Sequence, residues 1–375
     1  MLMNLTLKVK LCPDEAQFDS LLKTMERFNE ACNFISDVAF EHHMANKVAL
    51  QKLIYQEIRA KYGLSAQLTI RAIAKVVEVY KRDKSIQPIF KPHGAMVYDQ
   101  RIMGWKGVDR VSILSLDGRL IVPYVGYDYF DNRTNRFRGQ ADLMLVDGVF
   151  YFCPIVDVPD GEPIKVGGVL GVDLGIVNLA VDSDGETFSG DKVEEVRSKS
   201  SKHRASLQST GTRSAKRRLK RISGREARFR RDVNHCISKN IVAKAKGTER
   251  AIALEDLKGI RNQTTVRKAQ RSRHSSWGFD QLRSFIEYKG KIAGVPVILV
   301  DPRGTSHICP KCAHNVRANR PNRNEFKCVQ CGFAGSADHI ASINIGARAV
   351  VNQPIVAEGF ISEHCSQLQL QAHEL

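Results

Sequence analysis

The order of apolar and polar positions changes from strand spacing to helix spacing near the start of the chain. Residues 3–11 alternate apolar and polar side chains, which is typical of a half-buried strand. Pro13 then opens a long stretch in which apolar residues recur every three or four positions, and this pattern persists to about residue 82. The sequence therefore predicts a strand within residues 1–12 and a helical segment over residues 13–83.

A strand-like pattern returns after this helical segment. Short apolar runs such as 111–114 and 149–152 are separated by Asp-Gly turns, and residues 158–163 form a linker rich in Pro, Asp and Gly. A strand, a helical insert and a strand meander together predict a small β-barrel that carries a helical insertion. The predicted barrel takes residues 1–12 and 84–160.

The second half of the chain has longer buried runs that predict an α/β architecture. Residues 169–174 and 251–254 are apolar runs of strand length, and a last helix is expected from about Asp338. We assign residues 165–305 and 335–351 to this α/β domain. The insert 306–334 and a loosely ordered tail, 352–375, complete the predicted organisation.

Charge is distributed unevenly along the chain. The protein has 57 Lys+Arg against 40 Asp+Glu, a formal net charge of +17. The helix-prone segment 191–250 alone holds 19 basic and 6 acidic residues, so it carries most of the excess. A run of charge is often only a solvated surface, but this concentration favours contact with a phosphate backbone. The side chains that we select for such contacts are Arg213, Lys216, Arg217, Arg218, Lys220, Arg221, Arg225 and Arg228.

The apolar runs and the cysteines of the sequence bear on where in the cell the protein resides. A membrane surface is the competing polyanion, but no apolar run approaches the ~18 residues of a spanning helix, and the first ten residues carry Lys8 and Lys10 where a signal peptide would be apolar. Five of the nine cysteines are scattered, as expected for reduced thiols. We therefore predict a cytoplasmic, nucleoid-associated protein without a membrane partner.

Four cysteines near the end of the chain form two CxxC pairs. Cys309 and Cys312 are followed, after 15 residues, by Cys328 and Cys331. This spacing fits a structural Zn²⁺ site in a ribbon, because each pair offers two thiolates on one tight turn. A redox dithiol is the alternative, but it suits a single CxxC better than a doubled one. The nearby histidines 307 and 314 are interpreted as neighbours, since four sulfurs complete the tetrahedron.

Three carboxylates stand at predicted element ends: Asp173 and Glu255 close strands, and Asp338 begins a helix. Singly, each fits a cap, a surface charge or a helix N-terminal charge. Together they predict a site for Mg²⁺, a hard cation that prefers carboxylate oxygens. Two such ions bound side by side support the hydrolysis of a phosphodiester. Asp182 and Asp184 are attributed to a turn. Asp256 follows Glu255 in an extended segment and is expected to point to the opposite face.

With these residues in place, the second half resembles the RuvC-like nuclease domain of the TnpB family. These are RNA-guided endonucleases of insertion sequences, related to type V CRISPR effectors. The matching motifs are Gly171–Gly175, Leu254–Leu257 and Ala337–Ile345, with the cysteine ribbon placed just before the third. The acids follow in the order Asp, Glu, Asp, whereas a DDE transposase ends on glutamate.

The resemblance implies a fold, an activity and partners. It implies an α/β RNase H-like (RuvC-like) nuclease domain with an inserted zinc ribbon, preceded by a wedge-like β-barrel with a recognition-like helical insertion. Asp173, Glu255 and Asp338 would be catalytic and hold Mg²⁺, while the cysteines hold structural Zn²⁺. The implied partners are a guide RNA, a complementary target DNA and a transposase encoded by the same element.

Other hypotheses remain open at this point. A type V CRISPR effector shares the chemistry and differs in the source of its RNA. A zinc-ribbon DNA-binding regulator without catalysis would need the cysteines and the charge but not the three acids. A structure-selective resolvase of RuvC type would need the acids but neither the ribbon nor the N-terminal half.

Overall fold

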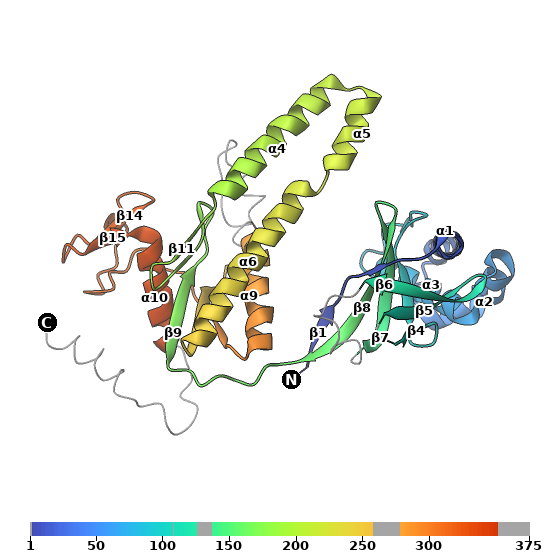
Figure 1. The fold of residues 1–375 in the computed structure, drawn as a ribbon, viewed down its shortest axis with the longest axis horizontal. Coiled ribbons are helices and arrows are strands. Elements are labelled where there is room, and N and C mark those ends of the chain that lie inside the picture. The colour runs from blue at the N-terminus through green and yellow to red at the C-terminus, as the bar shows by residue number, and fades with distance from the viewer. Residues whose placement is uncertain (1, 108, 126–136, 258–277, 352–375) are drawn as a thin grey trace. The chain divides into compact units, whose positions relative to one another are not determined.

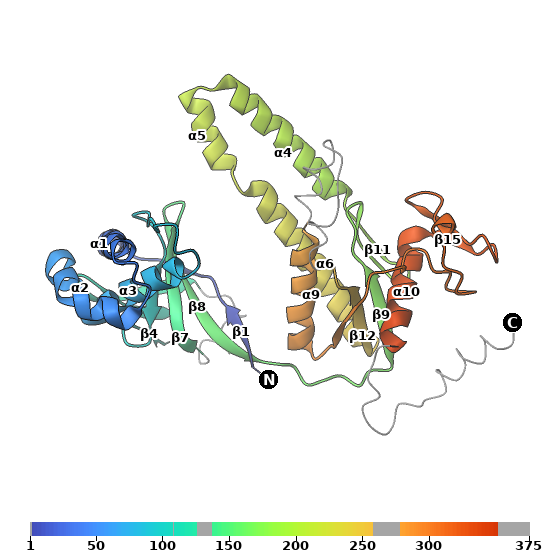
Figure 2. The same cartoon turned by 180° about the vertical axis from the view of Figure 1, so that it is seen from behind.

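The computed structural model describes residues 2–107, 109–125, 137–257 and 278–351 (Figures 1 and 2). The chain divides into two compact units, Met1–Pro159 and Asp160–Leu375, and each is described by itself. The predicted tail, 352–375, lies outside the described residues. Within those residues, no helix has the length and apolar character needed to cross a membrane.

An eight-stranded antiparallel sheet forms the framework of the first unit and curls into a nearly closed barrel. The order is β3-β7-β8-β2-β6-β5-β4, with β1 also paired to β8. A left-handed turn at Asp147 and Gly148 joins the two longest strands. The strands are β1 Leu2–Thr6, β2 Val9–Leu11, β3 Met96–Asp99, β4 Met103–Lys106, β5 Arg110–Ser115, β6 Gly118–Val125, β7 Phe137–Val146 and β8 Val149–Pro159.

Three helices are inserted between β2 and β3, within the segment predicted to be helical. They are α1 Glu15–Glu41, α2 Lys47–Tyr62 and α3 Ala66–Tyr80. Asp14 begins α1 with a reciprocal cap to Gln17, and Asn46 and Ser65 accept backbone hydrogen bonds at the starts of the next two helices. Their apolar faces supply buried side chains such as Phe28 and Ile73.

The second unit is built on a five-stranded mixed sheet in the order β11-β10-β9-β12-β13. β9, β12 and β13 run parallel, and β10 pairs antiparallel with both β9 and β11. Because the parallel strands are buried on both faces, their sequences are nearly continuous apolar runs. Their bounds are β9 Gly168–Asp173, β10 Asn178–Asp182, β11 Thr187–Ser189, β12 Arg250–Glu255 and β13 Val297–Val300.

Helices cover both faces of this sheet (Figures 1 and 2). On one face, α6 Arg225–Gly247 and α9 Phe279–Ala293 bury Ile241 and Ile286 against strand residues such as Leu254. On the other, α10 Ala337–Val351 buries Ile345 and Ala349 against Ala253 and Val300. The unit is therefore a three-layer α/β sandwich with its core on both sides of β12.

A helical arm extends from the sheet within the same unit (Figure 1). It consists of α4 Asp191–Thr210, α5 Arg213–Ile222 and the N-terminal part of α6. Gly211 and Gly224 take left-handed conformations at the joints between these helices. No residue of α4 is buried, and Ala215 is the buried residue of α5.

The last insert lies between β13 and α10. It contains a short 3-10 helix at Arg317–Asn319 and a two-stranded hairpin, β14 Glu325–Lys327 and β15 Ala334–Ser336. Phe326 packs with Cys309, Cys328 and Ile340 in a small apolar cluster of its own. The insert therefore rests on the first turn of α10.

Candidate active site

Asp173 and Glu255 lie at the same edge of the sheet because they end neighbouring parallel strands. β9 and β12 pair in the register Gly171 to Ala253 and Val172 to Leu254, so the next residue on each strand is a carboxylate. Strand-end positions of this kind collect functional groups in open α/β sheets. The sequence prediction that both acids close strands is confirmed.

Asp338 reaches this edge through a close approach of α10 to β9. A Cβ atom at Gly171 would overlap the Ser342 carbonyl oxygen and lie 2.6 Å from the Gly346 nitrogen. Only glycine allows the helix backbone to lie directly on the strand at this point. Asp338, in the first turn of α10, therefore comes close enough to interact electrostatically with Asp173.

The electrostatics of Asp173 report the proximity of all three acids. Burial, together with the charges of Glu255 and Asp338, raises the pKa of its carboxyl to about 8. Burial also raises the pKa of Glu255, although a hydrogen bond from Thr305 and the charges of two arginines oppose this shift. Clustered carboxylates with raised pKa values are typical of a functional site that holds cations.

Three polar side chains that the sequence did not suggest hold the acids. The Thr305 hydroxyl donates to Glu255 Oε1 at 2.5 Å, and Asn178 Nδ2 donates to Asp338 Oδ2 at 2.9 Å. Arg320, from the cysteine insert, lies with Nη2 3.4 Å from Asp338 Oδ1. Nothing in their spacing marks them, since each is brought from a different part of the chain by tertiary contacts: Asn178 begins β10, and Thr305 and Arg320 lie in loops.

Asn344 connects this edge of the sheet to the cysteine insert. Its buried amide donates to the carbonyl of Thr305 at 2.7 Å and to that of Ile308 at 2.8 Å. The first hydrogen bond orients the residue whose hydroxyl contacts Glu255, and the second holds the backbone just before Cys309. α10 therefore positions both the second carboxylate and the entry to the insert.

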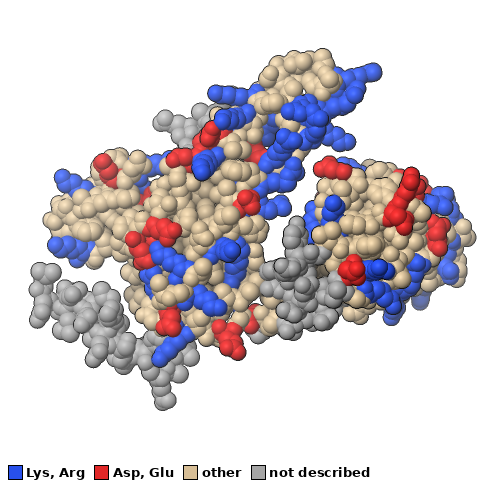
Figure 3. All heavy atoms as spheres, viewed as in Figure 1, with Lys and Arg blue, Asp and Glu red and all other residues tan. Residues whose placement is uncertain are grey.

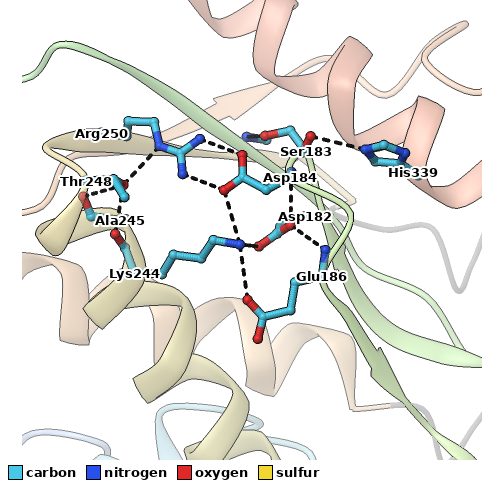
Figure 4. Close-up of polar contacts among 10 residues, drawn as sticks. Asp182, Ser183, Asp184, Glu186, Lys244, Ala245, Thr248, Arg250 and His339 are labelled. Atoms are coloured by element: carbon cyan, nitrogen blue, oxygen red, sulfur yellow. Dashed lines mark hydrogen bonds and ion pairs between the residues drawn. The ribbon is translucent and has the colours of Figure 1, made fainter.

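Asp182 and Asp184, which the sequence analysis attributed to a turn, have structural partners (Figure 4). Asp182 is buried and pairs with Lys244 of α6, which also contacts Asp184 and Glu186 across the β10–β11 turn. Arg250 forms a fork with both oxygens of Asp184 at 2.8 and 2.6 Å. These contacts tie the turn to α6 and β12, and they explain the acids without catalysis.

Asp256 likewise diverges from the residue beside it. Its carboxylate pairs with Arg283 of α9 at 2.9 Å, whereas Glu255 is held by Thr305. The expectation that consecutive residues of an extended segment separate onto different faces is met at this position. Asp256 therefore serves as a structural neighbour and a useful control.

The four cysteines of the insert converge on one point. Their sulfurs all lie within 4.8 Å of one another, and Cys309 and Cys331 Sγ are 3.6 Å apart while Cys312 and Cys328 Sγ are 3.5 Å apart. Tetrahedral bonds of ~2.3 Å would separate the sulfurs of a zinc site by ~3.8 Å. The donor set and spacing therefore fit a metal ion. Among the described residues, these cysteines are the group of three or more candidate ligands whose ligand atoms all lie within 4.8 Å of one another.

The two CxxC turns have the same backbone form. The residue after each second cysteine is left-handed, Ala313 at φ 59° and Gly332 at φ 73°, and each donates its N–H to the carbonyl of the first cysteine. Asn319 is fully buried between the turns. Its amide donates to the His307 and His314 carbonyls and its oxygen accepts from the Val329 N–H. The histidines thus contribute backbone carbonyls to this bridge.

The selected basic side chains lie on the arm, in α5 and at the start of α6. All eight are solvent-accessible, and Lys and Arg gather over this arm (Figure 3). Their positions, in the described part of the chain, are Arg213, Lys216, Arg217, Arg218, Lys220 and Arg221 on α5, and Arg225 and Arg228 on α6.

Two models of known protein families match the chain. A family model described as "Probable transposase" matches residues 155–262, and one described as "Cas12f1-like, TNB domain" matches residues 279–345. A TnpB-like protein of Methanocaldococcus jannaschii is 35% identical over 128 residues, which cover 34% of this chain and 45% of that protein. The predicted resemblance to the TnpB family is confirmed.

Two further relatives extend the similarity. The CRISPR-associated endodeoxyribonuclease Cas12f1 of Sulfoacidibacillus thermotolerans is 30% identical over 53% of this chain and 50% of its own length. The putative RNA-guided DNA endonuclease InsQ of Escherichia coli is 24% identical over 86% of this chain and 87% of its own length. The chain thus spans about half the length of the archaeal TnpB-like relative and of Cas12f1.

Solved structures share the fold at low sequence identity. The Cas12f1 chain of a complex with sgRNA and target DNA superposes with a TM-score of 0.64 at 12% identity, over 92% of this chain and 99% of that one. The mini-RNA-guided endonuclease CRISPR-Cas_phi3 gives 0.56 at 11% identity, over 95% of this chain and 94% of that one. The architecture therefore resembles that of Cas12f effectors.

Proposed function

We propose that the protein is an RNA-guided DNA endonuclease of a transposable element. The observation that carries the proposal is the electrostatic cluster of Asp173, Glu255 and Asp338. It unites three motifs at one sheet edge, although the first and last acids are 165 residues apart in the sequence. The relatives support it, because their names include RNA-guided and CRISPR-associated DNA endonucleases. The sandwich of the second unit is then an RNase H-like, RuvC-like nuclease domain.

Asp173, Glu255 and Asp338 are proposed to hold Mg²⁺. The residue types suit this ion, since they offer oxygen donors, and a cation would neutralise the charges of Glu255 and Asp338 that raise the pKa of Asp173. Bound Mg²⁺ supplies an activated water and stabilises the leaving oxygen of a phosphodiester. The protein's part is to keep the carboxylates oriented through Thr305 and Asn178.

The cysteine cluster is proposed to hold one structural Zn²⁺ through Cys309, Cys312, Cys328 and Cys331. Because binding free energy at such sites is folding free energy, the ion would order the insert that carries Arg320 to Asp338. The insert 306–334 then supports the acidic site without taking part in the chemistry of the phosphodiester.

The remaining domains follow from the same proposal. Residues 1–12 and 84–160 would act as the wedge-like barrel, and residues 13–83 as its recognition-like insertion. A guide RNA and a target DNA are the proposed partners, with sequence read by base pairing and the arm contacting backbone. A cytoplasmic location beside the nucleoid and a transposase encoded by the same element remain predictions.

A type V CRISPR effector remains the second hypothesis, since Cas12f1 is among the relatives and differs in the origin of its guide. Sequencing the RNA that copurifies with the protein separates the two. RNA transcribed beside the gene supports the transposon form, whereas repeat-derived RNA supports the CRISPR form. A regulator without catalysis leaves the clustered acids unexplained.

The deciding experiment is cleavage with a rewritten guide. Purified protein, Mg²⁺ and the copurifying RNA should cut a complementary duplex at one site, and changing the guide segment should move the cut. Omission of RNA should leave salt-sensitive, unselective binding. Site-specific cutting by RNA-free protein would reject the proposal and favour a resolvase.

A further inference from the structure

The helical arm encloses an open hollow between α4 and the junction of α5 with α6. Its volume is about 440 Å³, within the range of small-ligand pockets. The helices do not close on each other here, because α4 buries no side chain and α5 buries only Ala215. One ion pair, Arg204 to Glu226 at 2.9 Å, joins α4 to α6 at the wall.

The charge of the lining is strongly positive. Glu226 is the acidic residue of the lining, and Arg204 already pairs with it. Like charges facing one hollow repel one another, so the free arm bears a cost that an anion would remove. The basic side chains of the wall are Lys199, His203, Arg204, Arg218, Arg225 and Arg230.

The start of α6 opens into the same hollow. Gly224, left-handed at φ 76°, precedes the helix and offers no side chain to cap it. The first-turn N–H groups of Arg225, Glu226 and Ala227 are thus free of a side-chain cap at a positive helix end. A helix N-terminus beside arginine forks matches the geometry of a phosphate group.

We infer that this hollow is a binding site for phosphate groups of a nucleic-acid strand. The inference rests on the nucleic-acid binding proposed above and assigns it a defined position. A long polyanion is favoured over a small solute because exposed basic residues, such as Arg217 and Arg221, continue outside the hollow along α5. A strand held in the hollow can extend over this outer surface.

The test uses the full chain and a matched pair of double variants. Arg218→Gln with Arg225→Gln removes two charges from the hollow, whereas Lys239→Gln with Lys246→Gln removes two exposed charges of α6 outside it. Inorganic pyrophosphate is the probe, titrated by calorimetry at low ionic strength without added Mg²⁺. The first variant should weaken pyrophosphate binding about tenfold or more, and the second should retain it.

Single-stranded RNA and DNA of one sequence then identify the strand. The affinity of the strand that enters the hollow should fall at least threefold more in the first variant than in the second. Equal losses in both variants, or unchanged pyrophosphate binding in the first, would overturn the inference. Pyrophosphate binding without a larger strand-specific loss would overturn it as well.

The outcome is separable from that of the nuclease proposal. Guided cleavage is measured on the wild-type protein in parallel. If cleavage is absent while the hollow variant shows the expected loss, the endonuclease proposal fails and the phosphate site stands. Circular dichroism of both variants checks that the exposed substitutions leave the helices intact.

Discussion

Arg320 Nη2 lies 3.4 Å from Asp338 Oδ1, so the cysteine insert contributes a cation to the acidic edge of the sheet. The charge of the same guanidinium group opposes part of the rise in the pKa values of Asp173 and Glu255. An arginine here favours the ionised carboxylates that a divalent cation requires. The insert and the proposed nuclease site are therefore coupled electrostatically.

Replacing Arg320 by Gln should slow DNA cleavage and move its pH dependence upward. Without the guanidinium charge, the pKa values of the acids rise, so higher pH is needed to ionise them. The pH profile of cleavage measures the shift, and zinc content should stay unchanged. Arg323→Gln, an exposed change in the same insert, is the control. An equal shift in both variants would show that the effect is not specific to Arg320.

Loss of any one of the three acids should abolish cleavage. Asp173→Asn, Glu255→Gln and Asp338→Asn should each reduce the rate by roughly 10³-fold or more, because each removes a charged ligand worth several kcal/mol of transition-state stabilisation. Filter binding should show that affinity for nucleic acid is nearly retained. Asp256→Asn, beside the site but paired with Arg283, should be milder. Wild-type rates in two of the three variants would refute the assignment.

The protein without Mg²⁺ should lose stability as the pH rises from about 4 to about 8. Over this interval the unfolded chain has released the Asp173 proton while the folded protein keeps it, because the folded pKa is about 8. Mg²⁺ should restore stability most strongly at the upper end of the interval. Urea unfolding with and without Mg²⁺ measures this, without a chelator that would also strip the cysteines. An identical pH slope in Asp173→Asn would contradict the prediction.

One zinc ion per chain should be found in freshly purified protein. Cys328→Ser should lower the zinc content and loosen the insert, and cleavage should fall because Arg320 and Asp338 lose their mutual support. Elemental analysis and limited proteolysis measure these effects. Cys236→Ser, an exposed cysteine on α6, should change neither. Absence of zinc from the wild-type protein would remove this assignment.

Gly171→Ala should destabilise the second unit by about 2–3 kcal/mol, the cost typical of overpacking. The added methyl group would overlap the Ser342 carbonyl and push α10 away from β9. Chemical denaturation measures the free energy of unfolding, and cleavage should fall as Asp338 moves. Gly247→Ala, where no heavy atom lies within 4 Å of the new group, should be neutral. Equal stability of the two variants would show that this contact is not tight.

The sequence predicted the parts of the site that depend on strand ends and short spacings. Asp173 and Glu255 follow apolar runs, and the cysteine pairs have a fixed local geometry, so both were visible without coordinates. Thr305, Asn178 and Arg320 were not, because each reaches its acid through tertiary contacts that leave no periodic signal in the sequence. The role of Gly171 also required the structure, since a close helix approach leaves no mark except the glycine itself.

Because α4 and α5 bury almost no side chains, their sequences are under weaker selection for stability than the sequences of the core elements. Substitutions on such a surface typically change the free energy of unfolding by no more than about 0.5 kcal/mol, so selection for stability constrains them weakly. The central strand β12 and helix α10, by contrast, bury most of their residues and tolerate little change. Descendants of this chain can therefore vary the arm, and with it the proposed contacts to nucleic acid, while the scaffold that carries the acids stays the same.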